Sequence, residues 1–372
     1  MANKYGGASF TEWQEGIEYC DVLRTEKSPK ELFFPQSEDL AAFKVSGKSI
    51  EIKDIRRDTE DFVVFGVRAC DAKAMDILDR VFLTEPRDSY YANRREHGVI
   101  ITMACGRPDE NCFCTAFGID PTTPGGDISA WKTEDAVYFE AITEKGQAFM
   151  EKIAALTEDC DTVAVDAQKI TVQKILKKLP LSDLNTDAFG GGKTMELFDD
   201  PAWEKLSESC LGCGTCTFIC PTCQCYDIKD YNTGNGVQRY RCWDSCMYSD
   251  FTMMAHGNNR TSQLQRYRQR FMHKLVYFPA NNDGMYSCVG CGRCVDKCPA
   301  STNIVKVIKA FEKACGFSLK YKILPRRPGD IATSYANPKK ANLELGWYAN
   351  LNIDDMCKSL WNWQSKNPNG YK

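Results

Sequence analysis

The chain has 372 residues, enough for two or three domains with separate hydrophobic cores. Its 47 basic and 50 acidic residues give a formal net charge of −3, which argues against nucleic-acid or membrane binding through charge. The 20 cysteines are many for a chain of this size and point to metal or thiol chemistry.

The N-terminus lacks the basic region and apolar stretch of a signal peptide. No apolar run approaches the roughly 20 residues that a membrane helix needs. We therefore expect a soluble, cytoplasmic protein in a reducing compartment, with no nucleic-acid and no membrane partner.

The first part of the chain, residues 1–198, has the pattern of a mixed α/β domain. Phe62–Val67 is a short run of β-branched and aromatic residues, which predicts a buried strand. Asp71–Leu83 has apolar residues at helical spacing and predicts a helix. Val99–Met103 predicts a second strand, and Thr162–Val165 a weaker one.

A glycine segment, Gly190–Gly192, follows Pro180 and predicts a linker before a second domain at residues 199–303. Two cysteine runs of the same form dominate that second domain. In each run, three cysteines are separated by two residues each, and a fourth cysteine follows three residues later with a proline behind it. The first run is Cys210, Cys213, Cys216 and Cys220, and the second run is Cys288, Cys291, Cys294 and Cys298.

Cysteines at this spacing, closed by Cys-Pro, are typical of a chain that binds a [4Fe–4S] cluster. Four-coordinate zinc needs no third cysteine two residues further on, and the chain shows no secretory context for disulfides. Because the fourth cysteine of each run usually binds the other run's cluster, we expect two crossed ligand sets. One set is Cys210, Cys213, Cys216 and Cys298, and the other is Cys288, Cys291, Cys294 and Cys220.

Between the two runs lie the 67 residues from Pro221 to Ser287, far more than a compact ferredoxin of two β-hairpins requires. Phe251–Leu275 has few glycines and apolar residues at helical spacing. This insert predicts a helical two-cluster ferredoxin domain, and the whole chain is expected to be of the α+β class.

The predicted helix carries a basic stretch, formed by Arg260, Arg266, Arg268, Arg270, His273 and Lys274. The stretch could dock an acidic partner or change the cluster potentials. We favour the plainer interpretation, a solvated helix face.

Several segments resemble the iron–sulfur beta subunit of cytoplasmic sulfhydrogenases ([NiFe] hydrogenases) and its relative, an iron–sulfur subunit of anaerobic sulfite reductase. The matching segments are Phe33–Gln36, Gly66–Asp71, Ile77–Phe82, Tyr90–Glu96, Cys112–Cys114, Cys210–Cys225, Arg241–Cys246 and Arg268–Lys274. The resemblance implies an electron-transfer subunit of an anaerobic complex, with a fold that includes the helical ferredoxin domain. Its partners would be a flavin subunit that handles NAD(P)H and another that handles hydrogen, polysulfide or sulfite.

Four further cysteines lie in the first part of the chain, each after a predicted strand or in a loop. They are Cys70, Cys105, Cys112 and Cys114. These thiols could hold a third iron–sulfur centre, but no spacing rule requires it. We favour the alternative that Cys70 and Cys105 are small buried hydrophobic residues and that the other two are loop thiols.

A second group of four follows the first run: Cys223, Cys225, Cys242 and Cys246. They could bind another metal, form a redox-active pair or only pack around the clusters, and we favour the structural role. The isolated Cys20, Cys160, Cys315 and Cys357 need no function beyond that of free thiols.

From about residue 304 the sequence changes character and resembles the C-terminal end of UDP-glucose 4-epimerase. The matching segments are Val305–Gly316, Arg326–Ile331, Ala341–Trp347 and Trp361–Tyr371. Residues 304–316 predict an amphipathic helix next to the second run. The chain has no glycine-rich dinucleotide turn and no Tyr-x-x-x-Lys pair in a suitable context, so we expect no epimerase activity from this extension at 304–372.

These features predict a non-catalytic subunit that relays electrons through two [4Fe–4S] clusters. Two alternatives remain. One is a structural zinc protein without a redox role. The other is a standalone iron–sulfur enzyme that binds a small substrate in its N-terminal domain.

Overall fold

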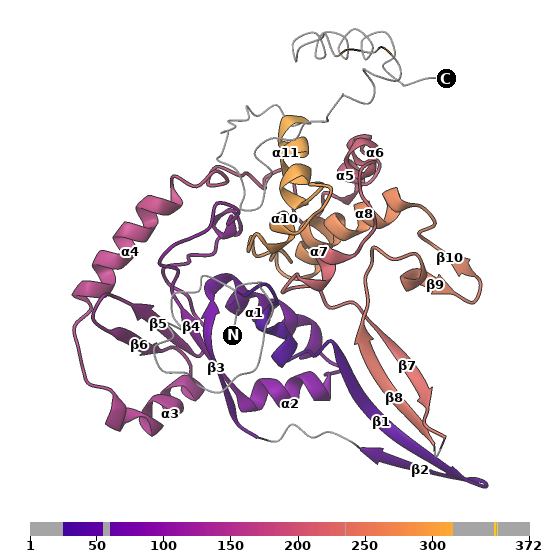
Figure 1. Ribbon diagram of the computed structural model, residues 1–372, viewed down its shortest axis with the longest axis horizontal. Coiled ribbons are helices and arrows are strands. Elements are labelled where there is room, and N and C mark those ends of the chain that lie inside the picture. Colours follow the sequence, from indigo (N-terminus) through magenta and orange to yellow (C-terminus); the bar gives the residue numbers. More distant parts are fainter. Residues whose placement is uncertain (1–24, 55–59, 235, 315–345, 347, 349–372) are drawn as a thin grey trace. The chain divides into compact units, whose positions relative to one another are not determined.

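The computed structural model describes residues 25–54, 60–234, 236–314, 346 and 348 (Figure 1). All helices and strands described below belong to the first of the two units into which the chain divides, residues 1–321. Helices and strands both contribute, so the expected α+β class is confirmed.

A mixed four-stranded sheet forms the centre of the N-terminal part, in the order β3-β4-β5-β6. Its strands are β3 (Phe62–Arg68), β4 (Gly98–Met103), β5 (Ile128–Lys132) and β6 (Val137–Ala141). The strands β3, β4 and β5 are parallel, and β6 runs antiparallel to β5. The helices of this part are α1 (Ala69–Phe82), α2 (Ser89–His97), α3 (Glu144–Lys152) and α4 (Val163–Leu176), with 3-10 turns at Pro29–Leu32, Cys114–Phe117 and Ala154–Leu156.

The two strands and the helix predicted with apolar patterns are confirmed as β3, β4 and α1. The strand β3 is buried on one face only, because Val64 is 8% exposed whereas Phe65 is 45% exposed. The strand predicted at 162–165 is wrong, since this segment begins helix α4. Four apolar residues do not distinguish strand from helix, and here the buried residues Val165, Val172 and Leu176 recur at helical spacing.

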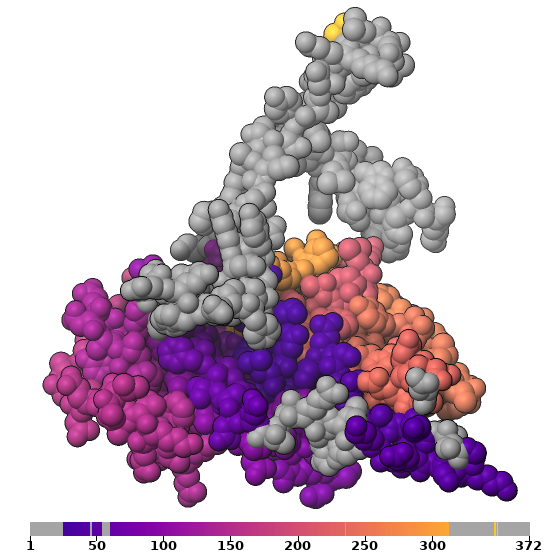
Figure 2. Space-filling view, turned by 60° about the horizontal axis from the view of Figure 1, so that its bottom comes forward, coloured from indigo at the N-terminus to yellow at the C-terminus, as the bar shows by residue number. Residues whose placement is uncertain are grey.

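A second, antiparallel sheet joins distant parts of the chain in the order β2-β1-β8-β7 (Figure 1). Its strands are β1 (Ser37–Ser46), β2 (Ser49–Asp54), β7 (Tyr226–Asn232) and β8 (Val237–Trp243). Opposite residues of β1 and β8 include Glu38 and Arg241, a buried ion pair with 2.5 Å between Oε2 and Nε. In the space-filling view the indigo surface of the N-terminal strands lies beside the salmon surface of the β7–β8 hairpin (Figure 2).

The remaining elements belong to the part of the chain with the two cysteine runs. They are α5 (Thr194–Leu197), α6 (Ala202–Ser207), α7 (Thr215–Phe218), β9 (Met253–Met254), β10 (Gly257–Asn258), α8 (Gln263–Met272), α9 (Phe278–Asn281), α10 (Arg293–Asp296) and α11 (Ile304–Ala314), with a 3-10 turn at Asp250–Thr252 and a π-helical turn at His273–Tyr277.

The helical insert is only partly confirmed. Its first half contains the β7–β8 hairpin, and the helix expected from Phe251 begins only at Gln263. Ser262 fixes that start through a capping box, in which its hydroxyl accepts from the Gln265 backbone while the Gln265 side chain accepts from the Ser262 backbone. Helical residues then continue without interruption from α8 through the π turn to α9.

The largest apolar core lies among these helices. Trp203 of α6, Tyr267 of α8 and Phe311 of α11 are each 1% exposed, and the Trp203 ring packs against the other two. The glycine segment predicted as a linker packs against this part, because the Gly190 backbone donates to the Leu275 carbonyl at 2.9 Å. This core surrounds and supports the two cysteine runs.

Candidate iron–sulfur centre

Both cysteine runs adopt the same backbone turn. The second cysteine of each run lies between two glycines with positive φ: Gly212 at 66° and Gly214 at 73°, then Gly290 at 58° and Gly292 at 79°. A glycine adopts this left-handed conformation without steric cost. A short helix follows each turn, α7 in the first run and α10 in the second.

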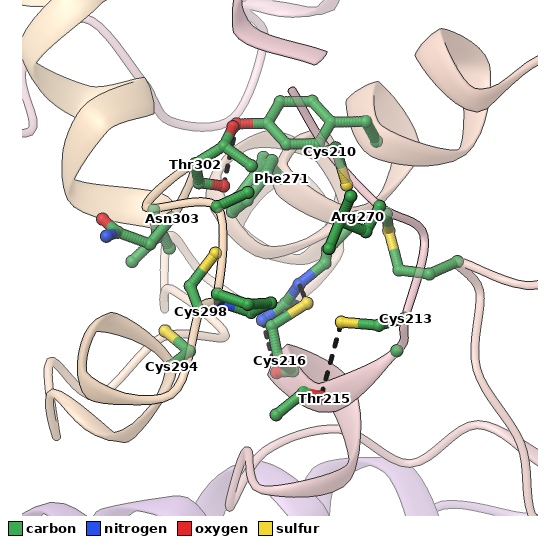
Figure 3. Close-up of a pocket in the computed structure, with 17 residues that line it drawn as sticks. Cys210, Cys213, Thr215, Cys216, Arg270, Phe271, Cys294, Cys298, Thr302 and Asn303 are labelled. Carbon is green, nitrogen blue, oxygen red and sulfur yellow. Dashed lines mark hydrogen bonds between the residues drawn. The ribbon is translucent and has the colours of Figure 1, made fainter. Parts of the chain in front are cut away.

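A cavity of about 480 Å³ lies between the two runs (Figure 3). Five cysteines line it: Cys210, Cys213, Cys216 and Cys298, together with Cys294, which also lines the second cavity described below. Figure 3 shows the thiols of Cys213, Cys216 and Cys298 around a common space, with the Arg270 side chain between the two runs. This cavity therefore brings the first three cysteines of one run to the fourth cysteine of the other.

A second cavity, of about 320 Å³, has the reverse composition. Its cysteines are Cys288, Cys291 and Cys294 of the second run and Cys220 of the first. The two cavities share Arg270, Cys294 and Ile304 in their walls, so they are direct neighbours. Two groups of four thiols in adjacent, largely apolar cavities suit two [4Fe–4S] clusters.

Two buried cations face the thiols. Arg270 is 2% exposed, and its Nε donates to the Cys216 sulfur at 3.0 Å while its Nη2 donates to the Cys216 carbonyl at 2.6 Å. Lys274 is 3% exposed, and its ammonium donates to the Thr222 hydroxyl at 2.6 Å and to the Ser287 carbonyl at 2.9 Å. The interpretation of the basic stretch as a solvated face is therefore wrong for these two residues.

The basic stretch indicated cations near the clusters as one possibility, but it did not indicate that Arg270 and Lys274 would be the buried ones. The feature of the sequence that indicates their burial is their spacing. Arg270 and Lys274 are four residues apart, on the side of the helix that also carries the buried Tyr267 and Phe271. A charged residue within the apolar face of a helix needs a buried partner.

Burial and the cations act in opposite directions on the thiols. Burial raises the pKa of the Cys288 thiol to about 12, and it also raises the pKa of Cys216 although Arg270 counteracts it. Burial alone would lower the pKa of Lys274, but the Cys220 and Cys223 thiols raise it above its usual value. The ammonium thus stays charged, and it stabilises negative charge on the sulfurs or on a cluster that they bind.

The second group of four cysteines does not form one site. Cys223 is hydrogen-bonded to Cys220, and Cys225 is hydrogen-bonded to Cys246. Cys242 lies in strand β8, opposite Ser37 and Asp227. The hydrogen bond from Cys246 lowers the pKa of the Cys225 thiol to about 7.

The four cysteines of the N-terminal part, in contrast, come together. Cys70, Cys105, Cys112 and Cys114 line a third cavity, of about 360 Å³. Of the isolated cysteines, Cys160 is exposed, whereas Cys20, Cys315 and Cys357 lie outside the described residues.

The helix expected next to the second run is confirmed as α11, with one face buried among the helices of the cluster part. Its Ile304 lines both cysteine cavities of the two runs. The rest of the epimerase-like extension lies outside the described residues, apart from Gly346 and Tyr348.

Two features are absent from the described residues. No helix within these ranges is long and apolar enough to cross a membrane. Nor do three or more His, Cys, Asp or Glu side chains of the described ranges form a group suited to a single metal ion, and this finding includes the eight cysteines of the two runs.

Comparison with known proteins gives two separate matches. The model of the 4Fe-4S dicluster domain matches residues 209–302, which contain both cysteine runs. Sulfhydrogenase 2 subunit beta of Pyrococcus furiosus is 35% identical over 291 residues, which cover 77% of this chain and 84% of that protein. The dicluster match, together with the two groups of thiols, establishes two [4Fe–4S] clusters as the cofactors.

The second match concerns a shorter piece. UDP-glucose 4-epimerase of Bifidobacterium longum subsp. longum is 59% identical over 70 residues, 19% of this chain and 21% of that enzyme. UDP-glucose 4-epimerase 3 of Oryza sativa subsp. japonica is 53% identical over 70 residues, 19% of each chain. This chain thus spans about a fifth of the length of these epimerases. No solved structure matches.

Proposed function

Since this chain belongs to the family of sulfhydrogenase beta subunits and is an iron–sulfur protein of electron transfer, we propose that it relays electrons between two partner subunits. One partner is a flavin subunit that handles NAD(P)H. The other is a hydrogenase or a protein that reduces sulfur compounds. The clusters supply one-electron transfer, and the chain holds them, excludes water from them and sets their potentials.

We assign the ligands by the two cavities. Cys210, Cys213, Cys216 and Cys298 bind the first cluster, and Cys288, Cys291, Cys294 and Cys220 bind the second. The observation that carries the proposal is the wall that the two cavities share. Adjacent clusters behind one wall form a path for electrons.

The role as one member of a complex has support from the edge strand β2. Its Ile50 is 65% exposed and its Ile52 is 67% exposed. An exposed edge strand with apolar side chains offers a surface on which another chain can pair or pack. A monomeric enzyme gains nothing from such an edge, but a member of a complex can use it.

The test is an anaerobic pull-down with the full tagged chain, followed by reduction with NAD(P)H. We expect capture of a flavin subunit together with a reducing partner, and we expect NAD(P)H to bleach the cluster absorption in the complex but not in the isolated chain. Cys213→Ala should remove the first cluster and stop electron transfer while the complex still forms. Cys160→Ala, which removes an exposed thiol, serves as the matched control.

Other outcomes identify the alternatives. A colourless protein that contains zinc instead of iron would make the chain a structural zinc protein. Substrate turnover by the isolated chain would make it a standalone enzyme. For the epimerase-like extension we propose no epimerase activity, because the matching piece covers so little of that enzyme; a fusion of two coding sequences explains it better than a bifunctional protein.

A further inference from the structure

We propose that Cys70, Cys105, Cys112 and Cys114 bind a third [4Fe–4S] cluster in the N-terminal part of the chain. The four thiols come from three separate segments and line one cavity. Cys70 lies in the first turn of α1, Cys105 follows strand β4, and the other two flank Phe113, with Cys114 at the start of the 3-10 turn Cys114–Phe117. Because β3 and β4 are parallel, the segments that leave their carboxyl ends meet at one edge of the sheet.

The third cavity resembles the cavities of the two runs. Like each of them, it has at least four cysteines in its wall. Besides the four thiols, its wall consists of Pro108, Pro121, Gly290, Cys291 and the 6% exposed Arg68. Cys114 belongs to the apolar core around Ile77 and Ile119, and Cys70 packs against that core. Burial alone would explain these two thiols, but it does not explain why all four line one cavity that also has a cation in its wall.

Backbone hydrogen bonds hold the thiols in place. The Cys105 amide donates to the Pro121 carbonyl at 2.9 Å, and the Ile119 amide donates to the Cys114 carbonyl at 3.2 Å. The Phe113 amide donates to the Gly290 carbonyl of the second run at 2.9 Å. The loop with Cys112 and Cys114 is therefore fixed against the second run.

Two glycines of the second run permit this close approach. A Cβ atom on Gly290 would lie 2.4 Å from the Phe113 backbone, and one on Gly292 would lie 2.5 Å from the Asn111 carbonyl oxygen. The corresponding glycines of the first run meet only side chains, those of Gln263 and Tyr248. The second run is thus shaped to take a backbone partner, and this partner carries two of the proposed ligands.

A buried ion pair connects the same two regions. The Asp71 carboxylate, next to Cys70, accepts two hydrogen bonds from the Arg293 guanidinium at 2.7 Å each. Arg293 follows Gly292 between two cysteines of the second run, and both side chains are 3% exposed. A buried bidentate pair of this kind fixes the distance between the two sites.

The position of the third site determines where its cluster lies in the row of clusters. Gly290 and Cys291 line both the second and the third cavity, whereas the first and third cavities share no residue among those that the structure describes. The order is therefore first, second, third. This inference rests on the proposed relay, in which the third cluster is the terminal member. Each electron transfer oxidises one cluster and reduces its neighbour by one electron, with no bond made or broken.

The test counts metal in the full chain, purified under anaerobic conditions. Three cubane clusters predict about twelve irons and about twelve acid-labile sulfides per chain, and two clusters predict about eight. Cys112→Ala should remove about four irons and one of the signals that electron paramagnetic resonance detects in the reduced protein. Cys160→Ala, the exposed thiol, and Cys242→Ala, the strand thiol, should remove none.

Three results would overturn the third cluster: about eight irons in the unchanged chain, zinc in place of the additional iron, or full iron content in Cys112→Ala. The iron count of the unchanged chain decides the question even if a variant does not fold. The outcome is also separate from that of the relay. Cys213→Ala tests the first cluster, so loss of iron there but not in Cys112→Ala would refute only the third site.

Discussion

At the scale of single residues, two buried cations determine the surroundings of the clusters. Arg270 lines both cavities of the cysteine runs, and Lys274 lines the second. A positive charge beside a cluster favours the reduced state, which carries one more negative charge. The chain can thus set the direction of electron flow through these side chains without changing a ligand.

We expect Arg270→Gln to lower the reduction potential of the first cluster by an amount on the order of 100 mV. Two unit charges about 6 Å apart interact by about 3 kcal/mol at an effective dielectric constant of about 20, and 100 mV corresponds to about 2.3 kcal/mol per electron. A redox titration followed by electron paramagnetic resonance measures the shift. Arg270→Lys, which keeps the charge, should shift the potential less.

The matched control is Arg268→Gln on the same helix. Its guanidinium lies 3.6 Å from the centre of the Phe198 ring and donates to the Phe198 carbonyl, and no cysteine lies among these partners. We expect no comparable shift. Equal shifts in Arg268→Gln and Arg270→Gln would mean that total charge, not position, sets the potential.

At the scale of elements, the helices that frame the clusters differ in how they are fixed. Helix α8 begins at a capping box and continues into the π turn that contains Lys274. A π turn is often found at functional sites, because it changes which side chains face the core. Helix α11 has no such local signal in its described part, and its place depends on the apolar face that it buries.

Phe311→Ala should therefore destabilise the cluster part by about 3–5 kcal/mol, the usual cost of removing a buried aromatic side chain. Phe311 is 1% exposed and packs against Phe189 and Trp203 at ring distances of 5.4 and 5.0 Å. Chemical denaturation under anaerobic conditions measures the change. Leu156→Ala, at a position 84% exposed, should change stability little; a similar loss in both variants would contradict the packing of α11.

Several elements could be predicted from the sequence, and others could not. The strands β3 and β4 and the helix α1 have clear apolar periodicity. The hairpin β7–β8 has no such pattern, because every residue of β7 is exposed. A strand without a buried face gives no alternation that sequence reasoning can use.

At the scale of the whole molecule, the N-terminal part and the cluster part are connected by two kinds of contact. The strands β1 and β8 pair across about 200 residues of sequence, from Ser37 opposite Cys242 to Phe43 opposite Val237. The Asp71–Arg293 pair connects the start of α1 to the second run. Each of the two parts therefore depends on the other for a strand partner and for one side of a buried ion pair.

Asp71→Asn should destabilise the protein by about 3–5 kcal/mol, because it leaves the Arg293 charge buried without its partner. Denaturation followed by cluster absorption measures this loss, and the second cluster should be released first. The control is Asp283→Asn, which breaks an exposed pair with Arg80 in which Asp283 is 86% exposed. Exposed pairs contribute about 0–1 kcal/mol, so similar losses in the two variants would refute a structural role for the buried pair.

The sequence by itself determined the cofactor, the family and the two groups of motif cysteines, because cluster ligation needs particular residues at short and regular spacing. Only the tertiary structure decided which distant side chains meet. It placed Arg270 and Lys274 against the thiols, separated Cys242 from its neighbours in sequence, and gathered Cys70, Cys105, Cys112 and Cys114 around one cavity. These contacts depend on strand pairing and helix packing between residues far apart in the chain, and no local spacing encodes them.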